Sequence, residues 1–406
     1  MVFTHRYYYI CMSIHIFMLN IILKDCQPTR DNLLPLAFTR PVADLRTGIL
    51  TIREKWETML PGVYSYLTLD YLSRKYPCIN NPEGDNIIIS AHYLPTPNII
   101  RCIKKLQPGE AITYNGEIIA ARGAADSTPA LLTEIDEIPP VIKNLYDLFL
   151  LNGIAIEFDF NLITKGRTSA PLSTTNTIIG DPGKIFIEED ATVEGITINA
   201  KGGPVYIGKG AEIMEGSCIR GPFALCDHSE VKMGAKIYGA TTVGPHCKVG
   251  GEISNTVFIG YSNKAHDGFI GNAVIGEWCN LAAGCVVSNL KNDYSEVKLW
   301  NYPARRFLRT GLQFCGLFMG DHSKTGINTM INTATVVGVG VNLHGAGYPR
   351  NFVPSFMEGS AAGLYEVPAS KFLDTARKVM ARRNITLSQV DADIFETLYK
   401  ITDDFK

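Results

Sequence analysis

The chain of 406 residues lacks any Cys-x-x-Cys pair, and its ten cysteines are scattered without a regular spacing. Zinc modules and disulfide frameworks depend on patterned cysteines, so these two classes are excluded. Unpatterned cysteines in a long chain are typical of a reducing compartment. We therefore predict a cytoplasmic protein.

The sequence also lacks an excess of either charge. It carries 38 Lys and Arg against 40 Asp and Glu, which gives a formal net charge of −2 at pH 7. A nearly neutral chain generates no global field that would attract a polyanion. We expect neither nucleic acid nor a membrane surface among its partners. The length itself predicts two or three domains.

A cleavage site is missing from the N-terminal region. The apolar stretch at residues 7–23 is interrupted by His15 and Asn20, and no small-residue cleavage site follows it. A secretory signal would have a continuous apolar run and such a site. We predict that residues 1–17 are an extension without functional weight and that the first domain begins at Met18. A targeting segment is the alternative.

An internal repeat occupies most of residues 193–343. Aliphatic residues recur every six positions over residues 207–249, and the same beat returns after residue 275. A hexapeptide period fits neither a helix nor an ordinary alternating strand, and it is typical of a β-solenoid. The positions that carry the beat are Ile207, Ile213, Ile219, Leu225, Val231, Ile237, Val243, Val249, Ile275, Leu281, Val287, Met319, Thr325, Ile331, Val337 and Leu343. We predict a left-handed parallel β-helix with these side chains inside.

Four regions follow from the pattern along the chain. After the extension, residues 18–165 alternate short apolar runs (20–23, 86–90 and 116–121) with helical spacing (49–60, 67–75, 98–106 and 139–150), which predicts an α/β domain. The solenoid is expected over residues 166–345, with a loop thrown out between residues 288 and 309. Residues 346–406 are expected to be helical, with N-caps at Ser370 and Ser388, and to cap the open core. We expect the basic residues of this last segment to form a solvated face: Lys371, Arg377, Lys378, Arg382 and Arg383.

The order of these two domains, together with the segment NLLPLAFTRPVADLR at residues 32–46, resembles a known family. The chain is similar to bifunctional UDP-N-acetylglucosamine pyrophosphorylase/glucosamine-1-phosphate N-acetyltransferases, and more specifically to the divergent version of Bacteroidetes-type bacteria. The resemblance covers nearly the whole chain after Met18. It implies a nucleotide-diphospho-sugar transferase-like first domain, an acetyltransferase solenoid and a homotrimer. It also implies a role in supplying amino-sugar nucleotides for the cell envelope.

The resemblance assigns residues to the acetyltransferase half. His266, five residues before Gly271, stands where the family has its catalytic histidine, and Glu252 stands where a carboxylate works with it. A histidine titrates near neutral pH and can accept the proton of the attacking amine. The implied substrate-binding residues are Asn280, Asn289, Lys298, Phe269 and Lys236. The implied acetyl-CoA-binding residues are Gly320, Val339 and Gly340.

Three departures from the family concern the acceptor. Phe269 replaces a tyrosine, Ser254 replaces a substrate-binding lysine, and Lys236 stands in the coil where an arginine is expected. These changes put the identity of the accepted hexosamine 1-phosphate in doubt more than acetyl transfer itself. His266, Asn280, Asn289 and the glycines also have an ordinary interpretation as residues at solenoid corners.

The nucleotidyltransferase half departs further. The family's glycine-rich phosphate loop is replaced by KDCQPTR at residues 24–30, and no Asp follows the run at residues 86–90 to bind Mg²⁺. Asp159 is a weak metal candidate, with a surface carboxylate as its alternative. The implied nucleotide and sugar-phosphate ligands are Lys24, Arg30, Arg40 and Arg46, since arginine binds phosphate with paired hydrogen bonds. We predict at best weak UTP-dependent transfer.

Two other functions compete with this interpretation. A solenoidal carbonic anhydrase needs three histidines around zinc, and His246, His266 and His322 are too widely spaced in the sequence for that. A trimeric scaffold that binds a sugar nucleotide without turnover is the second alternative, and it is favoured by the lost glycines and the lost basic residues.

Overall fold

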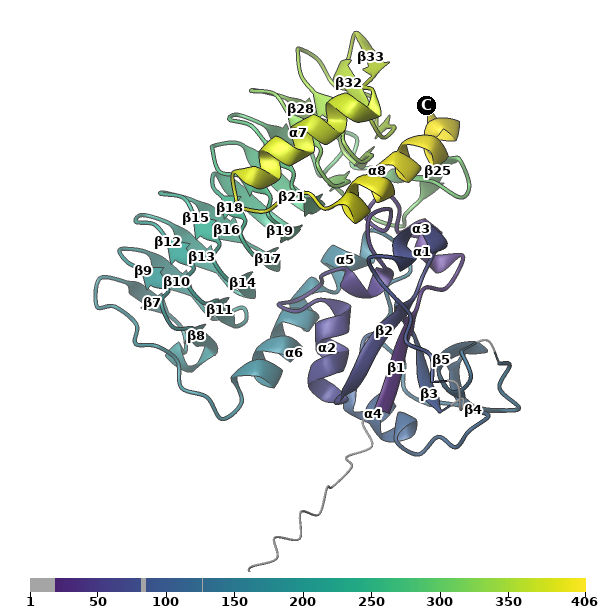
Figure 1. Ribbon diagram of the computed structural model, residues 1–406. Helices are drawn as coiled ribbons and strands as arrows, with labels where there is room; N and C mark the ends of the chain where they lie inside the picture. Colours follow the sequence, from purple (N-terminus) through teal and green to yellow (C-terminus); the bar gives the residue numbers. More distant parts are fainter. Residues whose placement is uncertain (1–18, 82–84, 126) are drawn as a thin grey trace, which may run out of the picture.

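The computed structural model describes residues 19–81, 85–125 and 127–406. The predicted extension at residues 1–17, its possible targeting role and the predicted start at Met18 lie outside the described residues. Figure 1 shows an α/β domain lying against one side of a long solenoid, with two helices at the C-terminus running along the solenoid. The predicted fold class is confirmed. No described helix is both long enough and apolar enough to cross a bilayer.

The α/β domain is built on a mixed sheet with the strand order β2-β1-β3-β5-β4-β6. Strands β2, β1 and β3 pair in parallel, and β1 and β3 are rich in isoleucine, which is typical of parallel strands covered on both faces. The strands are β1 (Leu19–Lys24), β2 (Gly62–Leu67), β3 (Asn86–Ser90), β4 (Glu110–Tyr114), β5 (Glu117–Gly123) and β6 (Leu131–Glu134). The helices are α1 (Thr29–Asn32), η1 (Val42–Asp44), α2 (Ile52–Met59), α3 (Asp70–Ser73), α4 (Pro97–Ile103), α5 (Asp147–Leu150) and α6 (Asn152–Thr164).

The helix predictions for this domain are only partly right. The helices expected at residues 49–60 and 98–106 are present as α2 and α4. The helix expected over residues 139–150 is wrong for most of its length, since only α5 is helical there. Helix α6, which follows α5 directly, was not predicted.

The solenoid has three faces made of parallel strands. The first face contains β7 (Thr177–Ile179), β10 (Thr197–Asn199), β13 (Cys218–Arg220), β16 (Lys236–Tyr238) and the first halves of β19 (Glu252–Gly260) and β21 (Phe269–Glu277). The second face contains β8 (Ile185–Ile187), β11 (Val205–Ile207), β14 (Phe223–Leu225), β17 (Thr241–Val243), the second halves of β19 and β21, β26 (Leu317–Met319), β29 (Thr335–Val337) and β31 (Phe352–Val353). The third face contains β9 (Thr192–Val193), β12 (Glu212–Ile213), β15 (Glu230–Val231), β18 (Lys248–Val249), β20 (Asn263–Lys264), β22 (Asn280–Leu281), β27 (Lys324–Thr325), β30 (Asn342–Leu343) and β32 (Met357–Ser360). A short 3-10 helix, η2 (Pro182–Lys184), precedes β8. Strands β23 (Val286–Val287) and β28 (Met330–Ile331) pair with each other in a separate two-stranded parallel sheet.

The six-residue beat does mark the inside of the solenoid. Its side chains are almost fully buried, from Ile207 at 0% exposed to Thr325 at 4%. In the third face, Lys264 takes the inward position between Val249 and Leu281. Its ammonium donates to the carbonyl oxygens of Gly250 and His266, and burial lowers its pKa. A cation inside an aliphatic column is costly unless its donors are used, which is what these two carbonyls do.

The loop expected between residues 288 and 309 does leave the solenoid, and it carries an antiparallel hairpin of β24 (Lys298–Asn301) and β25 (Arg306–Arg309). At the far end, β33 (Gly363–Glu366) folds back on β32, and Leu364 packs against the core. This hairpin, rather than the helices, covers the open end.

The C-terminal helices run along the flank of the solenoid instead. Helix α7 (Ala369–Ala381) begins near the last coil, where Lys371 pairs with Glu358, and its end reaches back to Asn263 through Arg383. Helix α8 (Gln389–Ile401) and the short η3 (Asp403–Phe405) follow. The C-terminal helices are present as predicted, but the prediction that they cap the open core is wrong, because they lie along the flank of the solenoid. The N-cap at Ser388 is confirmed, while Pro368 precedes α7 where Ser370 was expected.

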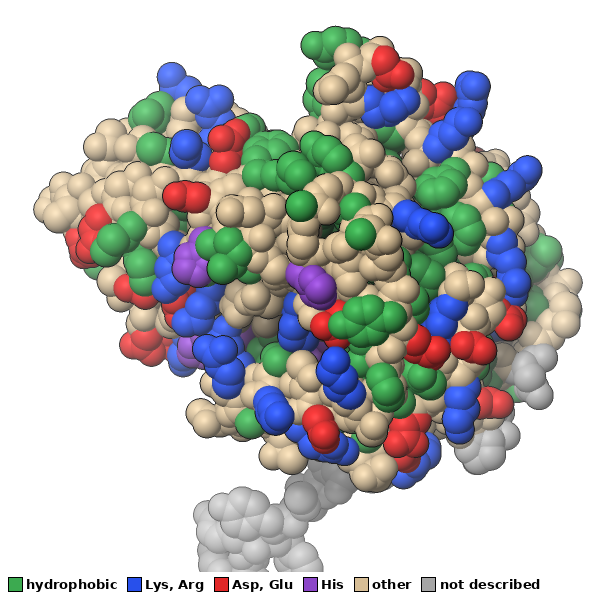
Figure 2. All heavy atoms as spheres, turned by 90° about the horizontal axis from the view of Figure 1, so that it is seen from above, with side chains coloured by type: hydrophobic (Ala, Val, Ile, Leu, Met, Phe, Trp, Pro, Cys, Tyr) green, Lys and Arg blue, Asp and Glu red, His purple; other side chains and the backbone are tan. Residues whose placement is uncertain are grey.

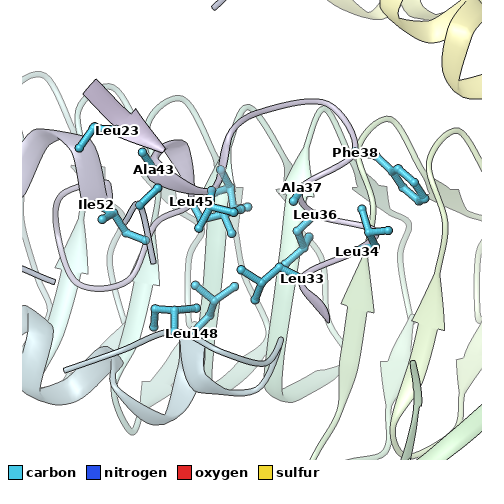
Figure 3. Packing of buried hydrophobic residues seen from close by; sticks show 14 of the residues in the cluster. Leu23, Leu33, Leu34, Leu36, Ala37, Phe38, Ala43, Leu45, Ile52 and Leu148 are labelled. Carbon is cyan, nitrogen blue, oxygen red and sulfur yellow. The ribbon is translucent and has the colours of Figure 1, made fainter. Parts of the chain in front are cut away.

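The α/β domain covers the second face of the solenoid. Ile156 and Phe160 of α6 pack on Phe186 and Tyr206, and Phe149 stacks on Phe318 at 6.1 Å between ring centroids. Segment 33–45 is inserted into the same interface, where its leucines point into a common apolar cluster (Figure 3). The outer surface, by contrast, carries basic and acidic side chains interspersed on the face that Figure 2 shows.

Candidate functional site

The predicted acetyltransferase residues centre on the corner between the third and the first face. His266 follows β20 and is exposed, and Phe269 begins β21 three residues later. On the first face Lys236, Glu252 and Phe269 are register partners in successive coils. The structure therefore brings these four residues to one edge of the solenoid.

The carboxylate of Glu252 already has a partner. Tyr238, on the neighbouring strand, donates its hydroxyl to Oε1 of Glu252 at 2.6 Å, and this hydrogen bond raises the pKa of Tyr238 to about 12. No hydrogen bond or ion pair joins Glu252 to His266 within the described residues. The backbone amide of Glu252 donates to the carbonyl of Gly268, two residues after His266, at 3.0 Å. Tyr238 is not among the predicted site residues, although it lies only two positions after Lys236.

Asn289 lies close to this group. Its Nδ2 donates to Oδ1 of Asn272 at 2.8 Å, and its side chain lies against Gly271, so a β-carbon at that glycine would meet it at 2.7 Å. Asn289 therefore borders the first face. A glycine at position 271 is what leaves room for it.

Two predicted substrate residues lie elsewhere. Asn280 points outward from the third face, between Asn263 and Lys324. Lys298 is exposed on the β24–β25 hairpin, beside a cavity of about 880 Å³ that is also lined by Lys291, Trp300 and Arg350. A single chain does not bring Asn280 together with His266 on one face.

The predicted acetyl-CoA residues are engaged inside the protein. The amide of Val339 donates to Oγ of Ser355, and the amide of Gly340 donates to the carbonyl of Asp321. The ring of Phe372 on α7 covers Gly340 so closely that an added β-carbon would meet it at 2.7 Å. The amide of Gly320 is bonded to the carbonyl of Val337.

The predicted phosphate-binding arginines are also buried and paired. Arg30 donates to the carbonyl of Ala37 at 2.7 Å and to the hydroxyl of Tyr71, and it lies 3.6 Å from the carboxylate of Asp25. Arg46 donates to the carbonyls of Ile49 and Ile259.

Among these three arginines, Arg40 makes the contact that is longest in sequence. Its guanidinium binds Asp321 and lies 3.0 Å from Oε1 of Glu277, and Thr39 donates its hydroxyl to the same aspartate. Arg40 is 5% exposed. Lys24, at the carboxyl end of β1, is the only one of the four predicted ligands that the structure leaves partly exposed.

Asp159 is fully buried, so its interpretation as a surface carboxylate is wrong. Its Oδ2 accepts hydrogen bonds from the amides of Ile49 and Leu50 and from the ammonium of Lys55. A cation already occupies this carboxylate, so the site does not fit Mg²⁺. In the described ranges, no group of three or more His, Cys, Asp or Glu side chains is placed to hold a metal ion.

His246 and His322 belong to a column of stacked rings at the corner between the second and third faces. Successive centroids lie 5.2, 4.8, 4.3 and 6.0 Å apart in the order His228, His246, Tyr261, Trp278 and His322. All five residues have a positive φ, which the tight corner requires. His266 lies at a different corner.

Residues 21–168 match the model of the sugar nucleotidyl transferase family. The chain is also similar to a bifunctional sugar-1-phosphate nucleotidylyltransferase/acetyltransferase of Sulfurisphaera tokodaii, with 30% identity over 283 residues, which are 68% of this chain and 63% of that protein. A bifunctional protein GlmU of Trichodesmium erythraeum is 26% identical over 140 residues, which are 34% of this chain and 25% of that protein. The chain thus spans less than two thirds of the length of these curated relatives.

Among solved structures, the polysialic acid O-acetyltransferase OatWY is similar with a TM-score of 0.23 and 13% identity, over 48% of this chain and 85% of that one. LpxA, a UDP-N-acetylglucosamine acyltransferase from Bacteroides fragilis, is similar with a TM-score of 0.20 and 13% identity, over 58% of this chain and 83% of that one.

Proposed function

We propose that this chain is a cytoplasmic N-acetyltransferase that transfers the acetyl group of acetyl-CoA to a hexosamine 1-phosphate. It belongs, on this proposal, to the Bacteroidetes-type branch and supplies amino-sugar nucleotides for the cell envelope. The observation that carries it is the edge formed by His266, Glu252, Phe269 and Lys236 on a hexapeptide solenoid. The bifunctional transferase relative supports the same reaction class.

The chemistry of this edge suits acetyl transfer. The amine nitrogen of the sugar attacks the thioester carbonyl, its proton passes to Nδ1 or Nε2 of His266, and the thiolate of coenzyme A leaves. Glu252 lies on the same edge of the solenoid, and its carboxylate accepts a hydrogen bond from Tyr238. Lys236 is exposed on the same face and can meet the sugar phosphate as a point charge.

The site is completed by further copies of the chain in this proposal. The α/β domain covers the second face, and α7 covers part of the third, so the first face is the one left open for a neighbouring copy. We propose a homotrimer in which Lys298 and Asn289 border the shared site. Sedimentation that shows a monomer at micromolar concentration would remove this arrangement.

Nucleotidyl transfer from UTP is at most weak in this proposal. Arg30, Arg40 and Arg46 have internal partners, and Asp159 is bound to Lys55. The first domain would then act mainly as the support of the solenoid. Robust Mg²⁺-dependent formation of UDP-N-acetylglucosamine by the purified chain would contradict this part.

A non-catalytic scaffold is the second candidate, favoured by the internal hydrogen bonds of Val339 and Gly340 beneath Phe372. Turnover separates the two candidates. Purified protein is assayed with glucosamine 1-phosphate and acetyl-CoA, and a scaffold would bind a ligand without releasing coenzyme A.

The catalytic assignment is tested by His266→Ala. We expect kcat to fall about 10²–10⁴-fold, the usual contribution of a positioned general base. His344→Ala is the matched control, because His344 is also an exposed histidine that follows a strand of the third face. Equal rates for the wild type and His266→Ala would show that His266 is only a corner residue.

A further inference from the structure

A groove lies between the third face of the solenoid and the end of α7. Its volume is about 460 Å³. The floor consists of four outward positions in successive coils, Lys248, Asn263, Asn280 and Lys324, which are register neighbours. The wall comes from α7 and the residues just after it, with Val379, Arg382 and Arg383.

The lining of this groove is strongly basic. Lys248 is paired with Glu230, but Lys324, Arg382 and Arg383 have no carboxylate within 4.0 Å anywhere in the described ranges. Arg383 is held in place by a hydrogen bond to Oδ1 of Asn263 at 3.1 Å. Basic side chains gathered without acidic partners repel one another, so the arrangement is favourable only when an anion is present.

Lys324 is one of the half-buried cations of this groove. Its ammonium donates to the carbonyl of His322 at 2.8 Å, which leaves two of its three N–H donors without a partner in the described chain. Burial lowers the pKa of Lys324. A bound anion would supply the missing acceptors and the missing negative charge together.

The aromatic side of the groove narrows the ligand class. Tyr261 and Trp278 line it, but both rings are already stacked in the column of the neighbouring corner, at 4.3 Å from each other and with His246 on the outer side of Tyr261. Their faces are therefore unavailable for stacking on a base. The amides of Asn263 and Asn280 and the cations are the groups that remain for recognition.

We propose that this groove binds the phosphate groups of a phosphate ester or diphosphate. The ligand lies between the third face and α7, with Lys324 beneath it and Arg382 and Arg383 above it. Binding would tie α7 to the solenoid, since the two sides of the groove come from segments far apart in the sequence. The proposal does not depend on the transferase activity proposed above.

The test is isothermal titration of the full chain with pyrophosphate. We expect one site per chain, weakened by added salt, since exposed parts of the groove are screened. Lys324→Gln and Arg383→Gln should each weaken binding about 10- to 100-fold, because each removes a charge-assisted hydrogen bond. Lys378→Gln is the control, since Lys378 is an exposed cation of α7 that does not line the groove.

Arg382→Gln keeps the test decisive if Lys324→Gln fails to fold, because the side chain of Arg382 is exposed. The absence of pyrophosphate binding, or an equal loss in Lys378→Gln, would overturn the proposal. In two further titrations, coenzyme A and uridine diphosphate each compete with pyrophosphate for the groove. The stronger competitor indicates which kind of molecule supplies the phosphate. His266→Ala should bind pyrophosphate like the wild type, so a failed transferase assignment remains distinguishable from a failed groove.

Discussion

Arg40 joins the two domains at a point almost closed to solvent. Its guanidinium faces Asp321 and Glu277, both of which belong to the solenoid. Charges are removed from water here, and their mutual attraction compensates only while both partners are present. The pKa of Arg40 is raised by the Coulombic attraction of Asp321 and then of Glu277, although burial alone would lower it.

Removal of Arg40 should therefore affect stability before it affects any ligand. We expect Arg40→Ala to lower the free energy of unfolding by about 3–5 kcal/mol, because Asp321 is left buried and unpaired. Urea unfolding measures this change. Arg377→Ala is the control, because Arg377 forms an exposed pair with Asp374 and its loss should cost at most about 1 kcal/mol. The double variant Arg40→Leu, Asp321→Leu should recover part of the loss, and no recovery would argue against the ion pair.

His92 should make the protein sensitive to acid. Burial lowers its pKa from 6.5 to about 4, and its Nε2 has no partner among the described groups. The unfolded chain binds the proton more readily, so stability is full above pH 6.5 and is lost as the pH falls from about 6.5 to about 4. The loss from this residue is on the order of 3 kcal/mol.

The measurement is the free energy of unfolding against pH for the wild type and for His92→Phe, which cannot titrate. The variant should lose this part of the slope between pH 4 and 6.5. An unchanged slope would mean that other groups cause the acid sensitivity.

The strands of the solenoid are the elements that the sequence predicts best. In each coil one side chain in six points into the core. That period appears directly in the sequence, because it arises from the solenoid itself and not from packing against another domain. Ile237 and Lys236 are neighbours on β16, with Ile237 1% exposed and Lys236 exposed. We expect Ile237→Ala to cost about 2–5 kcal/mol through the cavity it leaves. Lys236→Ala should change stability by no more than about 0.5 kcal/mol. Equal costs in thermal or urea unfolding would contradict the assigned inward position.

Helix α6 shows why other elements could not be predicted. Its buried residues include Ala155, Ile156 and Phe160, but Asp159 is buried among them, so no single apolar stripe appears. The helix lies between α2 and the second face, and a helix covered on two sides loses the amphipathic signature. Helices α7 and α8 are each covered on one side only, so their apolar spacing allowed both helices to be predicted from the sequence.

In the candidate site, the sequence could not predict which groups the arginine side chains would bind. The sequence identified Arg30, Arg40 and Arg46 as cations fit for phosphate, and residue type alone allows no more. A guanidinium donates equally well to a phosphate, a carboxylate or a carbonyl. Which acceptor it meets depends on contacts across hundreds of residues, such as Arg40 with Asp321. His266, by contrast, lies at an exposed corner next to the strand that carries Phe269, and its catalytic role stays a prediction.

At the scale of the whole molecule, the two domains share one interface instead of being joined by a linker alone. Asn152 accepts the amide of Gly48 at 2.6 Å and donates to the carbonyl of Ala240 across the interface, and Thr242 donates to the carbonyl of Gly48. Val257, Val274 and Phe318 of the second face belong to the same apolar cluster as the core of the α/β domain. Separating the domains would expose this surface to water.

We therefore expect both domains to unfold in one transition. Trp56 lies in the α/β domain, whereas Trp278 and Trp300 lie in the solenoid, and these are the three tryptophans of the chain. Trp278→Phe with Trp300→Phe leaves a fluorescence probe only in the first domain, and Trp56→Phe leaves probes only in the solenoid. For each variant, urea unfolding is followed both by tryptophan fluorescence and by circular dichroism of the backbone. The two signals should have the same urea midpoint. Loss of Trp56 fluorescence at a lower urea concentration than loss of the backbone signal would show that the α/β domain unfolds first and that the shared apolar cluster does not couple the two.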